Sequence, residues 1–432
     1  MLSIEKDVET RVAQKFRYYS FVTTAYSFLL FYFGVALLND GLNVIIPFVE
    51  NMHGWSRGQV TSVVSIAALI SIIVSYIVGT LVLRFGVKKN LIPILAMTGL
   101  AAIVMSRSNN FLDFSLCLGS LQVFAASGIM LLPAVLLANW YVKRKGIAMG
   151  IATIGAPLSG ATYSPIVAWL IGHYGFDTAY SMVGIIIILI AAAGGLLLAN
   201  KPEDVGLSPD GVDRTPEEVE KARKELENLE SKWTLKQILS KKESWFYMVS
   251  FGLLSLIITG IMSQLIPRFL DVGYSMPRAL FFLSVASLLG MPVSFAWGWL
   301  DDKISTRITC MIFALTFALG SFCFLFASAQ NLVFTILAVF AVASLTGGMP
   351  NLEISIIASI FGRNEFVNVQ RYLRVGVNAL RSLGYAVMGL IFDKFGSYNI
   401  SYGIFVVLAV FAAVLIFMAR GQYNNAVVEQ AD

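Results

Sequence analysis

Four polar side chains in the predicted eleventh membrane span offer the clearest chemistry in this chain of 432 residues. Arg374, Asn378, Arg381 and Tyr385 are spaced i, i+4, i+7 and i+11, so a helix places them on one face. Arg381 lies about ten residues from either end of its apolar run, near the bilayer midplane. Its guanidinium stays charged and its planar fork of donors suits a carboxylate. The stripe predicts an anion site in which Arg381, Asn378 and Tyr385 contact substrate; alternatively, Arg381 pairs with an acidic residue of another span.

A second polar face is predicted in the first span, where Tyr32, Asn39, Asp40 and Asn43 follow helical spacing. Asp40 lies about 7 Å from the midplane at the helical rise per residue. A carboxyl group can exchange a proton where a guanidinium cannot. Asp40 is therefore either a proton carrier or the partner of an ion pair with Arg381 that substrate releases, with a structural role as the third reading. Tyr32, Asn39 and Asn43 are expected to line the substrate site.

Glu353 in the tenth span and Arg374 in the eleventh lie at the same predicted depth, about 11 Å to the cytoplasmic side of the midplane. This placement predicts an ion pair that helps to close the cytoplasmic end. Arg374 could instead extend to the inner headgroups. Helix-breaking residues at positions 155–165 and 344–351 predict close helix packing and bending in spans five and ten.

The composition requires a membrane to surround these residues, because 57% of the chain is hydrophobic and only 13% is charged. About twelve apolar runs are each long enough to cross roughly 30 Å of hydrocarbon as a helix. The predicted spans are residues 22–48, 58–82, 91–107, 113–139, 147–171, 179–199, 246–267, 279–300, 308–327, 332–359, 371–392 and 400–419.

Loop charges predict the orientation. With the N-terminus inside, cytoplasmic segments apart from the central loop hold about sixteen Lys and Arg, against about five outside. We therefore expect both termini in the cytoplasm, a multi-pass protein of the cell membrane or inner membrane, and no cleaved leader. The net charge of +5 follows this bias, which makes a nucleic-acid partner a poor interpretation. His53 and His173 fall in short outer loops, and the three cysteines lack metal-ligand spacing, so no metal or cofactor is expected.

The chain divides into three predicted segments: a six-helix bundle at residues 1–199, a cytoplasmic linker at 200–244 and a second six-helix bundle at 245–432. The linker carries a predicted helix from Thr215 and an amphipathic stretch anchored by Trp233 and Trp245. The bundles repeat at an offset of about 220 residues, as a two-lobed alternating-access carrier requires. The expected fold is an all-α membrane protein of twelve transmembrane helices in two pseudo-symmetric six-helix bundles.

The loop after the eighth span carries a family pattern. Gly298, Asp302, Lys303 and Arg307 match Gly-x-x-x-Asp-(Arg/Lys)-x-x-x-Arg, which resembles the signature loop of the major facilitator superfamily. The first bundle matches it loosely, with Leu83 in place of the acidic residue. This resemblance implies that Asp302 belongs to the cytoplasmic gate together with Glu353 and Arg374.

Three further stretches are similar to the branch of oxalate/formate antiporters and monocarboxylate transporters: HGWSRGQ, NWYVKRKGIAMGIATIGAPLSG and KPEDVGLSPDG. In that branch a basic residue in span eleven acts with another in span eight as a clamp for a dicarboxylate. Arg381 matches the first residue, but residues 281–300 contain no basic side chain. A single cation favours a monocarboxylate over oxalate.

The expected function is secondary active transport of an organic anion by proton symport or anion exchange, with the lipid bilayer and a small organic anion as partners and a monomer as the working form. The competing hypothesis is a proton-coupled exporter of amphipathic or cationic compounds that uses Asp40 and Glu353 as binding carboxylates. An enzyme or receptor is disfavoured because the sequence shows neither a nucleophile with its base nor a large soluble domain.

Overall fold

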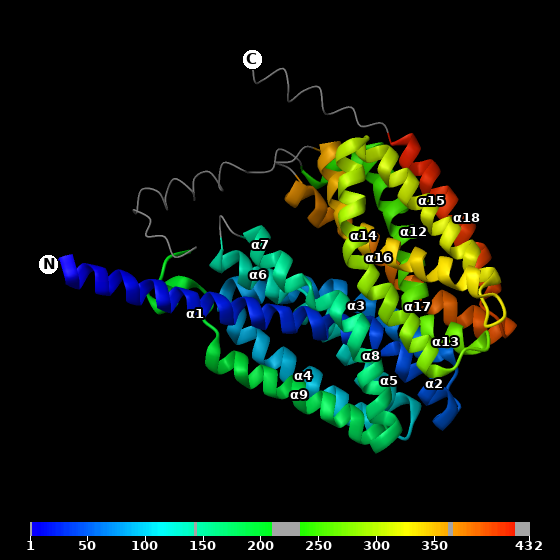
Figure 1. Cartoon of the computed structure of the whole chain (residues 1–432), viewed down its shortest axis with the longest axis horizontal. Coiled ribbons are helices and arrows are strands. Elements are labelled where there is room, and N and C mark those ends of the chain that lie inside the picture. The colour runs from blue at the N-terminus through cyan, green and yellow to red at the C-terminus, as the bar shows by residue number, and fades with distance from the viewer. Residues whose placement is uncertain (1, 142–144, 210–233, 362–365, 420–432) are drawn as a thin grey trace, which may run out of the picture. The chain divides into compact units, whose positions relative to one another are not determined.

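The computed structural model describes residues 2–141, 145–209, 234–361 and 366–419, and these residues form helices and short connections (Figure 1). Side chains are described from residue 12 onward, apart from those of residues 145–146 and 366–368 and the gaps between the ranges. Within these residues the only extended pairing is one isolated bridge between Ser328 and Asn331. The all-α prediction is confirmed.

Twelve helical segments of the described residues are long and apolar enough to cross a membrane. The prediction of twelve spans is therefore confirmed, although the first span is longer than expected and runs from Val12 to His53. It joins α1 (Leu2–Val35), a π-turn η1 (Ala36–Asp40) and α2 (Leu42–His53). The chain packs into two compact units, with boundaries after residues 41, 69 and 225, of which the first two fall inside the first two spans.

Unit 1 comprises residues 1–41 and 70–225. It contains α1, η1 and the C-terminal part of α3 (Arg57–Phe85). Its remaining elements are α4 (Val87–Ser106), α5 (Phe111–Phe124), η2 (Ala125–Ile129), α6 (Leu132–Trp140), α7 (Lys145–Thr153), α8 (Gly155–Tyr174), α9 (Phe176–Leu197) and η3 (Pro202–Val205).

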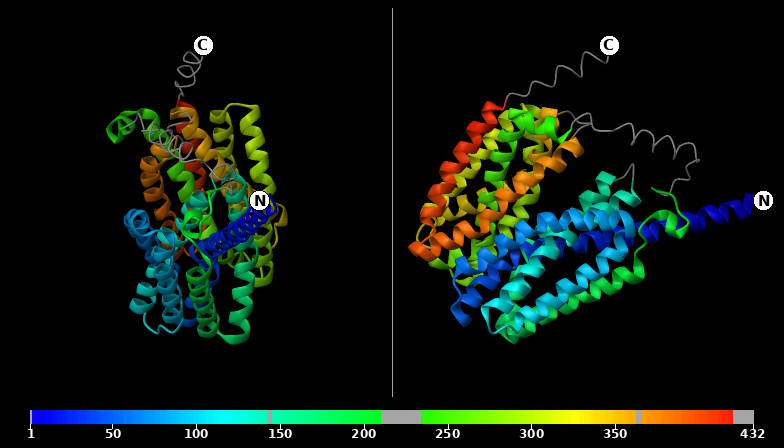
Figure 2. Two further views of the ribbon diagram at one scale, coloured as in Figure 1. Left: turned by 90° about the vertical axis from the view of Figure 1, so that its left-hand side faces the viewer. Right: turned by 180° about the vertical axis from the view of Figure 1, so that it is seen from behind.

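Unit 1 is built from several packed helix pairs. α4 lies along α9, and α1 lies along α8 (Figure 2). A Cβ atom on Gly155 would lie 2.3 Å from the carbonyl oxygen of Phe28, so α8 approaches α1 as closely as backbones allow. Span five breaks at Ile154, between α7 and α8, directly before this contact. The predicted hinge region at 155–165 therefore contains a packing glycine beside a real interruption of the helix.

Unit 2 comprises residues 42–69 and 226–432. It contains α2 and the N-terminal part of α3. The other elements are α11 (Leu235–Ser240), α12 (Lys242–Ser263), α13 (Leu265–Asp271), α14 (Met276–Lys303), α15 (Thr306–Phe326), α16 (Leu332–Phe361), α17 (Phe366–Phe395) and α18 (Asn399–Met418).

Three long pairs build unit 2: α12 with α17, α14 with α16, and α15 with α18. A Cβ atom on Gly384 would lie 2.2 Å from the carbonyl oxygen of Leu256, which shows how tightly α17 presses on α12. The core between the helices is aromatic and aliphatic, with Phe251, Phe313 and Phe405 fully buried. These pairs hold α17, and with it the predicted anion stripe, in a fixed position within unit 2.

The predicted linker lies partly outside the described residues. The helix from Thr215 and the anchor Trp233 fall in residues 210–233, which the structure does not describe. The described part contains α11, where Thr234 caps the helix and Gln237 returns the hydrogen bond to the Thr234 backbone. Trp245 is exposed, and its indole N–H donates to the carbonyl oxygen of Leu239. The division at residues 200 and 244 stays a prediction.

Candidate functional site

Arg381 lies near the middle of α17, in unit 2, and is half-buried. Its Nε donates to the hydroxyl of buried Thr259 on α12 at 3.2 Å. Because α17 is one uninterrupted helix, the predicted face holds: Asn378 is half-buried, Tyr385 is buried and Arg374 is exposed. In the described part of unit 2, Arg381 has no acidic partner within ion-pair distance. The guanidinium also bonds the Tyr385 hydroxyl, so its described partners are neutral, and two hydroxyls use fewer than its five N–H donors.

The helix backbone beside Arg381 is contacted by a hydroxyl group of a neighbouring helix. The hydroxyl of Ser65 on α3 donates to the carbonyl oxygen of Ser382 at 2.7 Å and accepts from the N–H of Ala386 at 2.9 Å. These two backbone groups bond each other in a regular α-helix. Ser65 therefore couples the position of α3 to the part of α17 that carries Arg381 and Tyr385.

Asp40 lies in unit 1 and is fully buried at the end of η1. Its Oδ2 accepts from the Ser159 hydroxyl at 2.6 Å, and its backbone oxygen accepts from Ser164 at 2.9 Å, both on α8. Within the described part of unit 1, Oδ1 has no hydrogen-bond partner and no cation pairs with the carboxyl group. The role of Asp40 as proton carrier or as ion-pair partner stays a prediction.

The π-turn changes the predicted face of the first span. Gly41 N–H donates to the carbonyl oxygen of Ala36 at 2.7 Å, five residues back, so one extra residue is inserted. The prediction of one continuous face assumed a regular α-helix and is wrong in this respect. Tyr32 bonds Thr162 at 2.9 Å in unit 1, and half-buried Asn39 and buried Asp40 follow it there. Asn43 lies beyond the turn, in unit 2.

Asn43 has a clear structural task. Its Nδ2 donates to the carbonyl oxygen of Met262 at 2.7 Å, and its Oδ1 accepts from the N–H of Ile266 at 2.9 Å. These groups flank the break between α12 and α13, where the helix ladder leaves them without their usual partners. Asn43 therefore repairs the backbone of span seven. Its predicted contact with substrate stays a prediction.

The predicted pair of Glu353 and Arg374 is present, with Arg374 Nε 3.7 Å from Glu353 Oε1. Glu353 is buried and also accepts from the Tyr247 hydroxyl at 3.1 Å. Both residues belong to unit 2, so the pair ties α16 to α17, and its gating role stays a prediction. Asp302 is exposed at the end of α14. The neighbouring Asp301 accepts from Ser355 instead, and sequence reasoning did not single it out.

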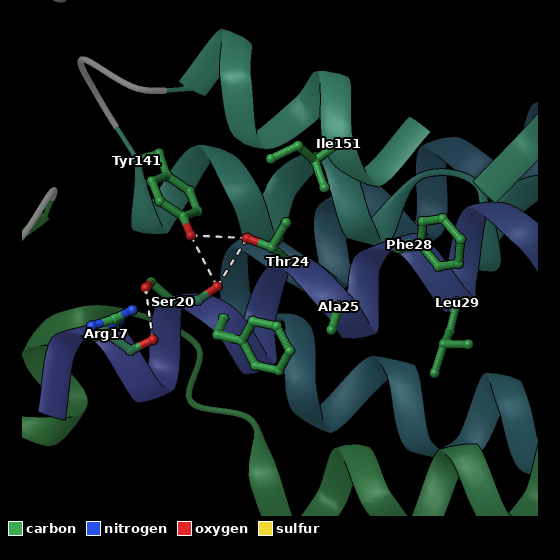
Figure 3. A pocket seen from close by; sticks show the side chains of 9 residues that line it. Arg17, Ser20, Thr24, Ala25, Phe28, Leu29, Tyr141 and Ile151 are labelled. Carbon is green, nitrogen blue, oxygen red and sulfur yellow. Dashed lines mark hydrogen bonds between the residues drawn. The ribbon is translucent and has the colours of Figure 1, made fainter. Parts of the chain in front are cut away.

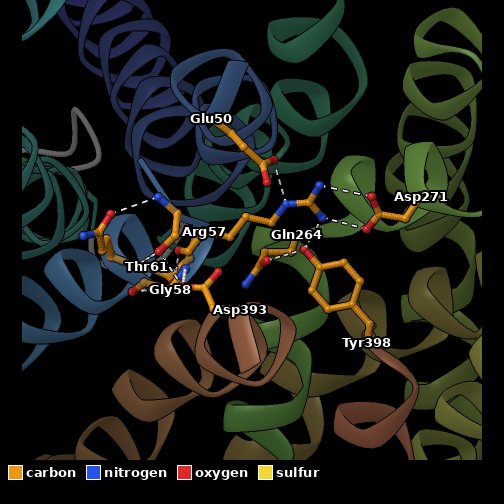
Figure 4. Close-up of polar contacts among 10 residues, drawn as sticks. Glu50, Arg57, Gly58, Thr61, Gln264, Asp271, Asp393 and Tyr398 are labelled. Atoms are coloured by element: carbon orange, nitrogen blue, oxygen red, sulfur yellow. Dashed lines mark hydrogen bonds and ion pairs between the residues drawn. The ribbon is translucent and has the colours of Figure 1, made fainter. Parts of the chain in front are cut away.

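The stretch HGWSRGQ forms a polar corner. From the sequence, this stretch indicated only a family resemblance, and none of its residues was predicted to have a functional role. Gly54 adopts a φ of 70°, and Ser56 caps α3 by accepting from the N–H of Gln59, whose side chain returns the bond. Asp393 on α17 accepts from the Ser56 hydroxyl at 2.5 Å and from the N–H of Gly58 at 3.0 Å (Figure 4). The Ser-x-x-Gln spacing is a capping-box signal that could have revealed this corner.

Arg57 is the centre of that corner and is buried (Figure 4). Its Nη1 and Nη2 donate to the two carboxylate oxygens of Asp271 at 2.6 and 3.1 Å, and its Nε donates to Glu50 at 2.8 Å. Nη1 also donates to the Tyr398 hydroxyl at 2.9 Å, and the guanidinium lies 3.9 Å from the centre of the Phe392 ring. Four of its five N–H donors are thereby used.

A separate cavity of about 650 Å³ lies in unit 1, at the N-terminal part of the first span (Figure 3). The Thr24 and Tyr141 hydroxyls lie 2.8 Å apart, and each lies within hydrogen-bond distance of the carbonyl oxygen of Ser20, at 2.9 Å. Arg17 completes the polar end, while Phe28 and Ile151 belong to the apolar wall. None of the predicted site residues lines it.

Twelve long apolar helices that carry ionisable side chains within their spans are typical of a membrane transport protein. The sequence model of the Major Facilitator Superfamily matches residues 28–369, and the chain belongs to this family. The family consists of transporters, and the chain is not an enzyme. The resemblance stated from the signature loop is confirmed.

Individual relatives are distant. Monocarboxylate transporter 13 of Bos taurus is 22% identical over 361 residues, covering 82% of this chain and 79% of the relative. The uncharacterized MFS-type transporter YhjX of Escherichia coli (strain K12) is 25% identical over 313 residues, covering 71% and 73%. A solved bacterial homologue of the human lysosomal transporter Spinster superposes with a TM-score of 0.72 at 15% identity, covering 93% of this chain and 97% of the homologue. The last likeness shows the fold.

Proposed function

We propose that the protein is a secondary carrier for an organic monocarboxylate, working by alternating access with proton symport or anion exchange. The observation that carries the proposal is Arg381, a half-buried cation at midspan that contacts the neutral hydroxyls of Thr259 and Tyr385 and has no acidic partner within ion-pair distance in the described part of unit 2. Holding an uncompensated guanidinium at this depth costs several kcal/mol, about 2.5 to 3.5 on insertion scales, which a bound carboxylate would offset. The distant relatives named monocarboxylate transporters support the same substrate class.

Asp40 is our proposed coupling residue. Its carboxyl group contacts only neutral partners in the described part of unit 1, so it can take up and release a proton without breaking an ion pair there. The alternative, an ion pair with Arg381 that substrate releases, corresponds to anion exchange and stays open. An exporter of cationic compounds is less well supported, because Glu353 already binds Tyr247 and Arg374.

The test is carboxylate uptake into proteoliposomes containing the full chain. Arg381→Gln is expected to reduce uptake of a monocarboxylate such as lactate by a factor of about 100, since the anion loses its charge-assisted hydrogen bonds. Arg278→Gln is the matched control, because Arg278 is an exposed cation of unit 2 and its loss changes the net charge equally. Uptake that persists in Arg381→Gln at the level of Arg278→Gln would exclude an anion site at Arg381.

A further inference from the structure

Arg57 and Asp271 come from opposite halves of the sequence, 214 residues apart, yet form a two-point ion pair inside unit 2. The loop charges predict that both lie at the outer end of their spans. Arg57 begins α3 in span two, and Asp271 ends α13, the continuation of span seven. The pair therefore joins the outer ends of spans that an alternating-access cycle must separate when the outer side opens.

The surroundings of the Arg57–Asp271 pair strengthen the attraction between the two charges, and removing either residue leaves the other charge partly buried without this partner. The Arg57 side chain is 9% exposed and that of Asp271 is 26% exposed, so water screens the bond only partly. Phe392 covers one face of the guanidinium, and Tyr398 connects it to buried Gln264 by donating to Oε1 at 2.5 Å. Burial raises the pKa of the Tyr398 phenol above its ordinary value, so the phenol keeps its proton and this link does not depend on physiological pH.

Asp271 is placed where it needs a cation. It is the last residue of α13, at the negative end of the helix dipole, where an acidic side chain is disfavoured. Arg268 lies one turn earlier on the same helix, buried, with Nη2 donating to the carbonyl oxygen of Phe324 at 2.6 Å. When Arg57 withdraws, Asp271 keeps a second cation within one helical turn. A second positive charge on the same helix therefore remains near Asp271 when the pair with Arg57 opens.

We propose that the Arg57–Asp271 pair is a releasable outer latch, which holds the outer ends of spans one and two against spans seven, eleven and twelve and breaks once in each transport cycle. The inference rests on the alternating-access cycle of the proposed function but not on the identity of the substrate. Glu50 has a different part. It lies on α2, in the same outer segment as Arg57, and its bond at 2.8 Å therefore orients the guanidinium without joining the two halves.

The latch is tested by measuring separations in the full chain without substrate. Spin labels at Met52→Cys and Asn399→Cys, both exposed, are introduced after replacement of the three native cysteines, and double electron–electron resonance is recorded in lipid nanodiscs. Arg57→Gln and Asp271→Asn are each expected to raise the ratio of the long-distance to the short-distance population by about tenfold. Arg57→Lys, which keeps the charge but loses the fork, should give a smaller rise.

Two comparisons decide the result. Glu50→Gln removes one carboxylate from the same guanidinium and is expected to change the ratio by less than about twofold. The double variant Arg57→Gln with Asp271→Asn should raise the ratio little beyond either single variant, because each single change already removes the same ion pair. The latch is overturned if the two single variants, eluting as monodisperse protein, keep the parental distances, or if Glu50→Gln shifts them equally. Failed carboxylate uptake with shifted distances would count against the substrate proposal alone.

Discussion

Two corners of unit 2 have the same backbone design and different chemistry. Residues 54–59 (GWSRGQ) begin α3, and residues 273–278 (GYSMPR), offset by 219, begin α14. Gly54 and Gly273 both adopt positive φ, at 70° and 91°, and a serine stands before each helix. Yet Met276 takes the place of Arg57. The repeat preserves the turn that starts a span, while the ionic network belongs to one copy alone.

The neighbours explain why the copies diverged. The first corner lies against α17, where Asp393 binds its Ser56 and Gly58 and Phe392 stacks on Arg57. The second corner lies near the start of α16, where the buried Tyr274 hydroxyl bonds the Ser328 carbonyl oxygen and Thr335 at 2.8 and 2.9 Å. One corner is therefore closed by charge and the other by neutral hydrogen bonds. Charge suits a contact that must be released, because water can solvate the separated ions.

The largest expected effect concerns the tight contact of the first corner. A Cβ atom on Gly58 would lie 2.4 Å from Asp393 Oδ2 and 3.1 Å from the Cα of Leu390, so Gly58→Ala forces α3 away from α17. We expect the free energy of unfolding to fall by about 2 to 3 kcal/mol, as in overpacked cores. Thermal unfolding in detergent measures this. Pro277→Ala, at the matching place of the second corner, should change stability little, and equal losses at both sites would show that the contact does not distinguish the corners.

The next effect should be shared. Gly54→Ala and Gly273→Ala each place a side chain on a backbone with positive φ, although neither position is crowded. The conformational cost is about 1 to 2 kcal/mol at each site. Similar falls in melting temperature are therefore expected for the two variants. A fall in melting temperature for only one of the two variants would mean that the two turns are not equivalent and that the corners do not share a backbone design.

The number of spans and the polar face of α17 could be predicted from the sequence, because they depend on the length of apolar runs and on residue spacing within one helix. The twelve spans follow from hydropathy, and the face of α17 follows from helical spacing in a helix without interruption. The predicted polar face of the first span was wrong because a π-turn inserts one residue, and the sequence from Ala36 to Asp40 contains no local pattern that predicts this turn. Helical spacing is reliable only where the ladder is regular.

Contacts between residues far apart in the chain could mostly not be predicted from the sequence. Arg57 stood in a recognised stretch, but Asp271 is 214 residues away and nothing local joins them. The same holds for Asn43, whose amide bonds backbone groups at a break in span seven, 219 and 223 residues further along the chain. The expected pair of Glu353 and Arg374 could be named because equal depth on neighbouring spans restricts the choice of partner. The predicted membrane depth of two residues therefore indicated a contact that their separation in the sequence did not.

The smallest effect separates the two serines that precede the helices. Ser56 accepts from the N–H of Gln59 at 3.2 Å and donates to Asp393, whereas the Ser275 side chain makes no capping bond. Ser56→Ala should therefore lower the free energy of unfolding by about 1 kcal/mol, and Ser275→Ala by less than about 0.5. Thermal unfolding of both variants in one detergent gives the difference directly. If Ser275→Ala costs as much as Ser56→Ala, the second corner uses its serine as the first does, and the corners differ only at Arg57.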